Sequence, residues 1–256
     1  SLLDEFARIA VEARPQAVLM ENVWGLAYQN HNTVPLARLV GQLESAGYQV
    51  HWTVLNAADF GVPQLRKRLF LYATLGVTPP FPLPTHSGWT ETKRTVDASL
   101  APYVTSREVI GDLEGLDDLA EPGEAVNGRY GALLPGIPPG QNYLYYTEKR
   151  GHPNPLFRWR SRYWTFLLKL DPDRPSTTIQ SQPGPYVGPF HWANRRLRQL
   201  ETKRLQTFPD DYIVVARSRR SWQNQLGNAV PPVLAEVVAK PIADALSGTR
   251  DLAAAS

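Results

Sequence analysis

The sequence has no cysteine among its 256 residues and a single methionine, Met20. The lack of cysteine excludes disulfide bonds, thiolate metal sites and a cysteine nucleophile supplied by these residues. No apolar run approaches the roughly 18 residues that a membrane span needs, and the first residues lack a signal-peptide pattern, so we expect a cytoplasmic protein that is not secreted. We also expect no metal, because the five histidines show no ligand spacing: His31, His51, His86, His152 and His191.

The charge is small in total but uneven along the chain. With 27 Lys and Arg against 24 Asp and Glu, the net charge is +3. Between Lys149 and Arg204 there are 12 basic and 3 acidic residues, a balance of +9, which leaves −6 for the remainder. Aromatic residues are interleaved with this basic segment, which favours contact with a phosphate backbone and stacking on bases. The alternative, a solvated basic face over an aromatic core, stays open.

Apolar spacing predicts a layered α/β domain at the N-terminal end. Helical periodicity covers residues 2–13 and 33–46, and strand patterns cover 17–20, 48–55 and 68–74. The first strand ends in a polar pair, Glu21 and Asn22, which places functional groups at its carboxyl end. Because strands and helices alternate with short connections, we expect a largely parallel sheet.

The pattern breaks at the proline-rich stretch 78–84, which suits neither a helix nor a central strand. Apart from an acidic helical stretch at 106–119, the following residues have the composition of loops. Helical periodicity returns from Leu200, and a proline-started helix is predicted over 231–245. We therefore expect three parts: the second half of a catalytic α/β domain (1–78), an irregular inserted module (79–185), and a return to the catalytic domain (186–256).

Four short motifs occur in a specific order: Glu21-Asn22-Val23, Gln64/Arg66/Arg68, Arg204 to Pro209, and Gly227 to Pro232. In this order, the sequence resembles the C-terminal portion of the DNA cytosine-5 methyltransferases, which carry ENV, QxRxR, RLQxFP and GNAVPP around a variable target-recognition region. The family's glycine loop (FxGxG) and its PCQ nucleophile loop are not in this sequence. The resemblance implies part of a Rossmann-like S-adenosylmethionine-dependent methyltransferase sheet with an inserted target-recognition module.

The resemblance implies catalytic roles for Glu21 and Arg68. In the family a cysteine thiolate attacks carbon 6 of the cytosine, and a carboxyl group assists at ring nitrogen 3. That carboxyl group corresponds to Glu21, and desolvation at the end of an apolar strand favours its protonated form. Arg68 is expected to hydrogen-bond the flipped base or the neighbouring catalytic groups.

Further residues are expected to contact DNA or the cofactor. Gln64 and Arg66 would position the loop or touch phosphate, and strand spacing puts Arg66 and Arg68 on one face. Arg158, Arg160 and Arg162 alternate with other residues, Trp159 among them, so we expect a strand there with one charged face. By resemblance, Asn228 lies against an S-adenosyl-L-methionine pocket that is incomplete in this chain. The remaining DNA-binding candidates are Arg158, Arg160, Arg162, Thr177 and Thr178.

The leading hypothesis is DNA cytosine-5 methylation by a subunit or fragment that acts on double-stranded DNA in the bacterial cytoplasm. A complementary chain or a missing N-terminal part would carry FxGxG and PCQ, so we expect no activity from this chain alone. The alternative is a non-catalytic DNA-binding or regulatory protein, which would have no need of Glu21 and Asn228. A sheet without its first strands would also have an open edge, so we expect the isolated chain to aggregate or pair.

Overall fold

The computed structural model describes residues 2–28, 33–76, 78–88 and 96–254. His31 lies outside these residues. The chain divides into two compact units, which are described separately. The first comprises Ser1–Phe60, Lys67–Thr85 and Val233–Ser256, and the second comprises Gly61–Arg66 and His86–Pro232.

The first unit is built on a three-stranded sheet with the order β1-β4-β2. Strands β1 (Ala17–Val23) and β2 (Gln49–Asn56) both pair antiparallel with β4 (Lys67–Thr74), so the expectation of a largely parallel sheet is wrong. The connection from β2 to β4 contains only a 3-10 turn, Ala57–Phe60. Two parallel neighbours need a longer crossover, usually through a helix. After this short turn, β4 therefore runs antiparallel to β2, and it lies between β1 and β2.

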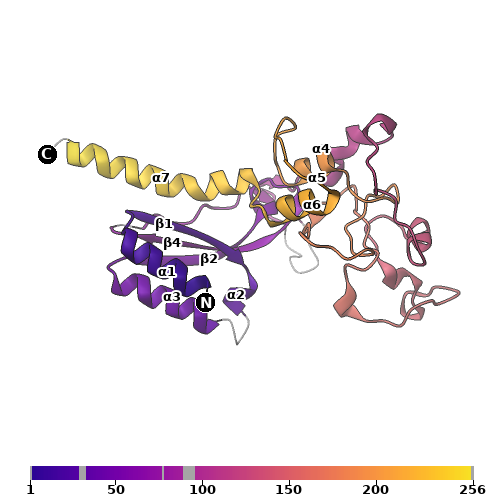
Figure 1. The fold of residues 1–256 in the computed structure, drawn as a ribbon, viewed down its shortest axis with the longest axis horizontal. Coiled ribbons are helices and arrows are strands. Elements are labelled where there is room, and N and C mark those ends of the chain that lie inside the picture. Colours follow the sequence, from indigo (N-terminus) through magenta and orange to yellow (C-terminus); the bar gives the residue numbers. More distant parts are fainter. Residues whose placement is uncertain (1, 29–32, 77, 89–95, 255–256) are drawn as a thin grey trace. The chain divides into compact units, whose positions relative to one another are not determined.

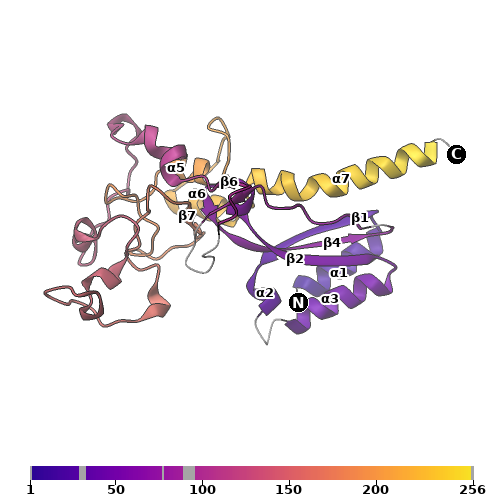
Figure 2. The same ribbon diagram turned by 180° about the vertical axis from the view of Figure 1, so that it is seen from behind.

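Helices cover both faces of this sheet (Figures 1 and 2). Helices α1 (Leu2–Ala13) and α3 (Thr33–Ser45), with the short α2 (Gly25–Tyr28), lie on one face, and α7 (Pro232–Ala254) lies on the other. Side chains alternate between the two faces of the sheet along β4, so the strand packs against helices on both sides. Leu69 and Leu71 point toward α1 and α3, while Tyr72 points away. The Tyr72 hydroxyl donates to the Val238 carbonyl oxygen at 2.5 Å.

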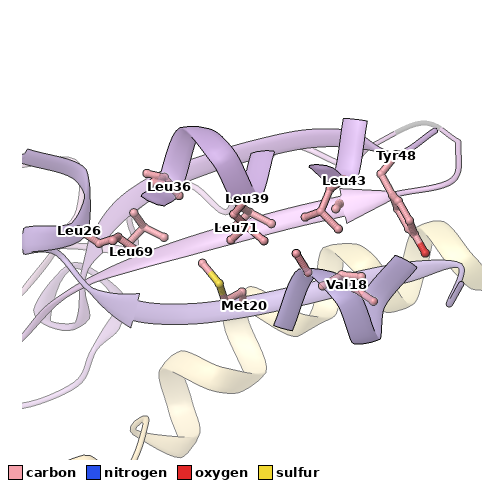
Figure 3. Close-up of a cluster of buried hydrophobic side chains, with 12 residues drawn as sticks. Val18, Met20, Leu26, Leu36, Leu39, Leu43, Tyr48, Leu69 and Leu71 are labelled. Carbon is pink, nitrogen blue, oxygen red and sulfur yellow. The ribbon is translucent and has the colours of Figure 1, made fainter. Parts of the chain in front are cut away.

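The core between the sheet and α3 consists mainly of aliphatic side chains, with Tyr48 at one end (Figure 3). Leu39, Leu43 and Leu71 are fully buried there, each contributing about 1.5–3 kcal/mol of transfer free energy. Met20 and Val18 extend the core along β1. The buried residues of β1, Val18 and Met20, therefore fix the strand up to the position just before Glu21.

The second unit has little regular structure, in agreement with its loop-like composition. Its strands pair in parallel, β3 (Gln64–Leu65) with β7 (Ser176–Thr177) and β5 (His86–Ser87) with β6 (Ala101–Pro102). Its helices are α4 (Ser106–Ile110), α5 (Gln199–Leu205) and α6 (Arg219–Asn228). Turns of 3-10 helix are at Gly111–Leu113, Asp117–Leu119, Gly131–Gly136, Tyr143–Tyr146, Glu148–Arg150 and Ser161–Tyr163.

The helical stretch expected over 106–119 is shorter in the structure. Thr105 caps α4 through a capping box with Glu108, but the α-helix ends at Ile110. Gly115 then adopts φ +77°, a conformation that favours glycine and is incompatible with a continuing right-handed helix. None of the described helices is long and apolar enough to cross a membrane.

Candidate active site and nucleic-acid interface

An ion pair joins the ENV and QxRxR motifs within the first unit. Arg68 lies opposite Val23 in the β1–β4 register, and its Nε is 2.8 Å from Glu21 Oε1. Both side chains are partly buried, with exposed fractions of 26% for Glu21 and 13% for Arg68. The structure therefore brings together the two residues expected to be catalytic.

This pair places a cation beside Glu21. Burial lowers the pKa of Arg68, and the charge of Glu21 and its hydrogen bond oppose that shift. The guanidinium stays charged at neutral pH. Next to the pair, Asn22 Oδ1 accepts a hydrogen bond from the Val23 amide at 2.8 Å, which orders the turn after β1.

Gln64 and Arg66 lie in the interior of the second unit, with exposed fractions of 0% and 1%. Arg66 Nη2 donates to the carbonyl oxygens of Gly227 and Ala229, both at 3.0 Å, and its Nη1 donates to the Ile179 oxygen at 3.4 Å. These bonds attach the QxRxR motif to the GNAVPP motif and to the segment after β7. Arg66 and Arg68 do not share one strand, because β3 ends at Leu65, β4 begins at Lys67, and the two arginines belong to different units.

A pair of glutamines, Gln64 and Gln206, connects the QxRxR motif to the RLQxFP motif. Gln64 Nε2 donates to Gln206 Oε1 at 3.2 Å, and Gln64 Oε1 accepts from the Ile179 amide at 3.2 Å. Gln206 in turn donates to the Leu226 carbonyl oxygen at 2.6 Å. Sequence reasoning did not single out Gln206, although its place inside a recognised motif was a usable signal. We call Gln64, Arg66 and Gln206 the buried polar cluster; their contacts with main-chain atoms indicate a positioning role.

The two threonines also contribute to this region. Thr178 Oγ1 donates to the Leu65 carbonyl oxygen at 2.8 Å, so its hydroxyl holds β7 beside β3. Thr177 Oγ1 is buried and has no hydrogen-bond partner among the described residues. Asn228 is exposed at the end of α6, where its Nδ2 donates to Asn224 Oδ1 at 3.2 Å.

Arg158, Arg160 and Arg162 do not form the expected charged strand. Residues 158–160 have no regular structure, and Ser161–Tyr163 is a 3-10 turn. The reason is a hydrogen-bonding competitor. The Tyr143 hydroxyl donates to the Arg160 carbonyl oxygen at 2.5 Å and accepts from the Arg160 amide at 3.1 Å. A side chain thereby satisfies main-chain groups that a neighbouring strand would otherwise pair.

The basic segment divides into compensated and uncompensated parts. Toward its C-terminal end the arginines are paired, Arg195 with Glu201 at 2.6 Å, Arg198 with Glu124 at 2.8 Å and Arg204 with Asp112 and Asp210 at 2.7 Å. In contrast, the basic side chains from 149 to 162 have no carboxylate partner in the described part of the chain: Lys149, Arg150, Arg158, Arg160 and Arg162. We call these five residues the basic surface.

The aromatic residues divide in a similar way. Phe157 and Phe166 pack with Tyr130 and Tyr143 inside the second unit, so they belong to a core. Trp159 is 37% exposed, and Lys149 Nζ lies 4.5 Å from the centre of its ring. The aromatic-core interpretation therefore applies to Phe157 and Phe166, and contact of the basic surface and Trp159 with DNA stays a prediction. Within the described residues no group of three or more histidine, aspartate or glutamate side chains could hold a metal ion.

Comparisons with known proteins agree with the four motifs. Residues 1–244 match the family of C-5 cytosine-specific DNA methylases. The chain belongs to this family. It is 47% identical over 257 aligned positions to the Type II methyltransferase M.SacI of Streptomyces achromogenes, covering 96% of this chain and 64% of that protein. It is 30% identical to the Type II methyltransferase M.BsuRI of Bacillus subtilis, covering 93% of this chain and 52% of that protein.

The fold is also shared with solved structures. One is a prophage-encoded protein of E. coli assigned as a DNA modification methyltransferase, with a TM-score of 0.57 and 19% identity over 94% of this chain and 73% of that one. This likeness confirms the expected α/β methyltransferase fold. The chain spans less than two thirds of the length of the two curated relatives named above.

Proposed function

We propose that this chain supplies part of the catalytic machinery and the target recognition of a DNA cytosine-5 methyltransferase. The observation that carries the proposal is the 2.8 Å pair between Glu21 and Arg68 at the carboxyl end of β1, in a member of this family. Both side chains are partly buried, and both would be available to a base that enters from solvent. The substrate class is double-stranded DNA with a target cytosine turned out of the helix, at a cost of a few kcal/mol.

Carbon 5 of cytosine becomes nucleophilic only after a thiolate sulfur has bonded to carbon 6. Glu21 would hold a proton at ring nitrogen 3, so that the protonated ring can accept the electron pair displaced when sulfur bonds to carbon 6. Arg68 lies beside the same carboxyl group, with its Nε 2.8 Å from Glu21 Oε1.

The thiolate has to come from polypeptide outside these 256 residues, because they contain no cysteine. That polypeptide is either the N-terminal part of the same protein or a partner chain, and it would also carry the glycine loop. We therefore expect no methyl transfer from this chain alone. The domain boundaries at 78/79 and 185/186 likewise remain a prediction.

S-adenosyl-L-methionine is the methyl donor that the family implies, and it supplies an activated methyl group when bound. The described residues provide little of a binding site for this molecule. Asn228 is exposed and bonded to Asn224, and it lines neither of the two cavities described in the second unit. Asn228 alone does not make a cofactor site, so the pocket has to be completed elsewhere.

The contact with DNA would depend on the basic surface, where uncompensated charge and the exposed Trp159 lie together. Neutralised phosphates release counterions, so each contact should steepen the salt dependence of binding. The buried polar cluster would hold the loops of the second unit in place without touching phosphate. The hydroxyl of Thr177 is a further candidate for a phosphate contact.

A radiolabelled methyl-transfer assay tests the proposal. We expect no transfer by the chain alone and transfer when a polypeptide with FxGxG and PCQ is added. Glu21→Gln should then lower the rate by at least about 100-fold, the usual size of an acid–base contribution. Glu44→Gln, an exposed carboxyl group of α3, serves as the matched control and should leave the rate unchanged. If DNA binding persists but no added polypeptide restores transfer, the non-catalytic DNA-binding alternative holds instead.

A further inference from the structure

The second unit contains a groove of about 570 Å³ that neither the motifs nor the basic surface explains. Residues 179–190 line one side, and the N-terminal half of α6 lines the other. Ile179, Val187 and Leu197 give it apolar walls. Its described lining includes three arginines, Arg196, Arg219 and Arg220, and no carboxylate. Arg219 is paired with Glu121 outside the lining, so the charge that suits an anionic ligand comes from Arg196 and Arg220.

The main chain on one side of this groove is held in place at several points. Gln223 Nε2 donates to the Gln180 carbonyl oxygen at 2.9 Å, and Arg196 Nη2 donates to the Pro185 oxygen at 2.6 Å. Gly227 packs directly against this segment, because a Cβ atom there would lie 2.5 Å from the Ser181 amide nitrogen. The segment 180–185 is therefore fixed before any ligand arrives, which lowers the entropic cost of binding.

Two polar side chains at the groove are, by contrast, uncommitted. Gln182 and Arg220 are both exposed, and no hydrogen bond or ion pair within the described part of the chain uses either side chain. Arg219 differs, because it already donates to Glu121 Oε2 at 2.8 Å and to the Leu197 carbonyl oxygen at 2.7 Å. A fixed backbone that presents unused donors and acceptors is suited to recognition rather than to stability.

We propose that this groove holds a strand of the target DNA and that Gln182 and Arg220 read base edges there. The proposal rests on the proposed function, because it needs DNA as the substrate. A carboxamide pairs with adenine through N6 and N7, and a guanidinium pairs with guanine through O6 and N7. These two residues would therefore determine sequence preference, whereas the basic surface would supply affinity that is independent of sequence.

Selection from a library of randomised DNA duplexes with the purified chain tests this assignment. We expect the unaltered chain to enrich a defined motif. Gln182→Ala and Arg220→Ala should each remove the preference at one or two positions, by about 5- to 150-fold, the range for one bidentate base contact. Gln49→Ala and Arg129→Ala, at exposed positions that do not line the groove, should leave the motif intact. Arg158→Ala should weaken binding to all sequences alike and reduce the salt slope by about one.

Two results would overturn the proposal while leaving the proposed function in place. One is DNA binding without any sequence preference, and the other is a motif that Gln182→Ala and Arg220→Ala do not alter. Failure of the chain to bind any duplex would contradict the proposed contact with DNA as well. Thermal unfolding of each variant separates a lost contact from a lost fold.

Discussion

Replacement of Arg66 separates a positioning role from a phosphate contact. Its guanidinium is 1% exposed and donates at least three hydrogen bonds, to the carbonyl oxygens of Ile179, Gly227 and Ala229. Arg66→Lys keeps the positive charge but loses the planar fork that reaches several acceptors at once. If Arg66 contacts phosphate, lysine should substitute well; if it positions the loops, stability should fall.

The expected magnitude follows from the carbonyl groups left without a donor. Each buried polar group that loses its partner costs about 1–3 kcal/mol. A lysine can still satisfy one of the three acceptors, which leaves two without a donor, so we expect Arg66→Lys to lower the free energy of unfolding by about 2–6 kcal/mol. With about 2–4 °C per kcal/mol for a chain of this size, the midpoint temperature should fall by roughly 4–24 °C.

Urea unfolding followed by tryptophan fluorescence measures this change. Arg129→Lys is the matched control, because Arg129 is exposed, and its free energy of unfolding should change by less than about 0.5 kcal/mol. DNA binding by the folded Arg66→Lys protein should keep its salt dependence. The reasoning is refuted if Arg66→Lys retains full stability, because a lysine that substitutes well there indicates a phosphate contact rather than a positioning role.

Two further predictions concern the second unit. Gly227→Ala places a Cβ atom 2.5 Å from the Ser181 amide nitrogen and should destabilise the protein by about 1–3 kcal/mol. The control is Gly41→Ala, whose Cβ atom meets no atom within 4 Å and which should leave stability unchanged or raise it. Calorimetry compares the two variants, and equal effects would contradict the steric argument. Burial lowers the pKa of His191 to about 4. The unfolded chain therefore binds a proton that the folded one does not between about pH 6.5 and 4, and stability should fall by up to about 3 kcal/mol as the pH is lowered through that window. His191→Asn should flatten this part of the stability–pH curve, and an unchanged slope would exclude His191 as its cause.

The sequence predicted the first unit well where apolar side chains repeat. The helices at residues 2–13 and 33–45 and the strands around them follow from that spacing, because each element buries one face against the same core. The direction of strand β4 could not be read in this way. Periodicity records which face of a strand is buried, and it is silent on which neighbour the strand pairs with.

For the candidate site, motif order predicted the partners better than residue type did. Arg68 was expected to hydrogen-bond the flipped base or the neighbouring catalytic groups, and it forms an ion pair with Glu21. The alternation of arginines at 158–162 suggested a strand, but the Tyr143 hydroxyl takes the main-chain groups that a strand would have used. Local spacing cannot reveal that competitor, because it lies 17 residues away in the sequence.

Most of the motifs by which this chain is placed in its family meet at the buried polar cluster rather than at a reacting group. Hydrogen bonds connect three of the motifs there, through Gln64 and Arg66, through Gln206, and through the carbonyl oxygen of Gly227. The first and the last of these motifs are more than 100 residues apart in the sequence. Buried polar groups of this kind tolerate few replacements, because each change leaves a partner unsatisfied. The motifs can therefore persist wherever the fold does, with or without catalysis. Under the proposed function, activity would depend on Glu21, on Arg68 and on a cysteine from outside these residues, so the Glu21→Gln rate and the Arg66→Lys stability would report on independent properties of the protein.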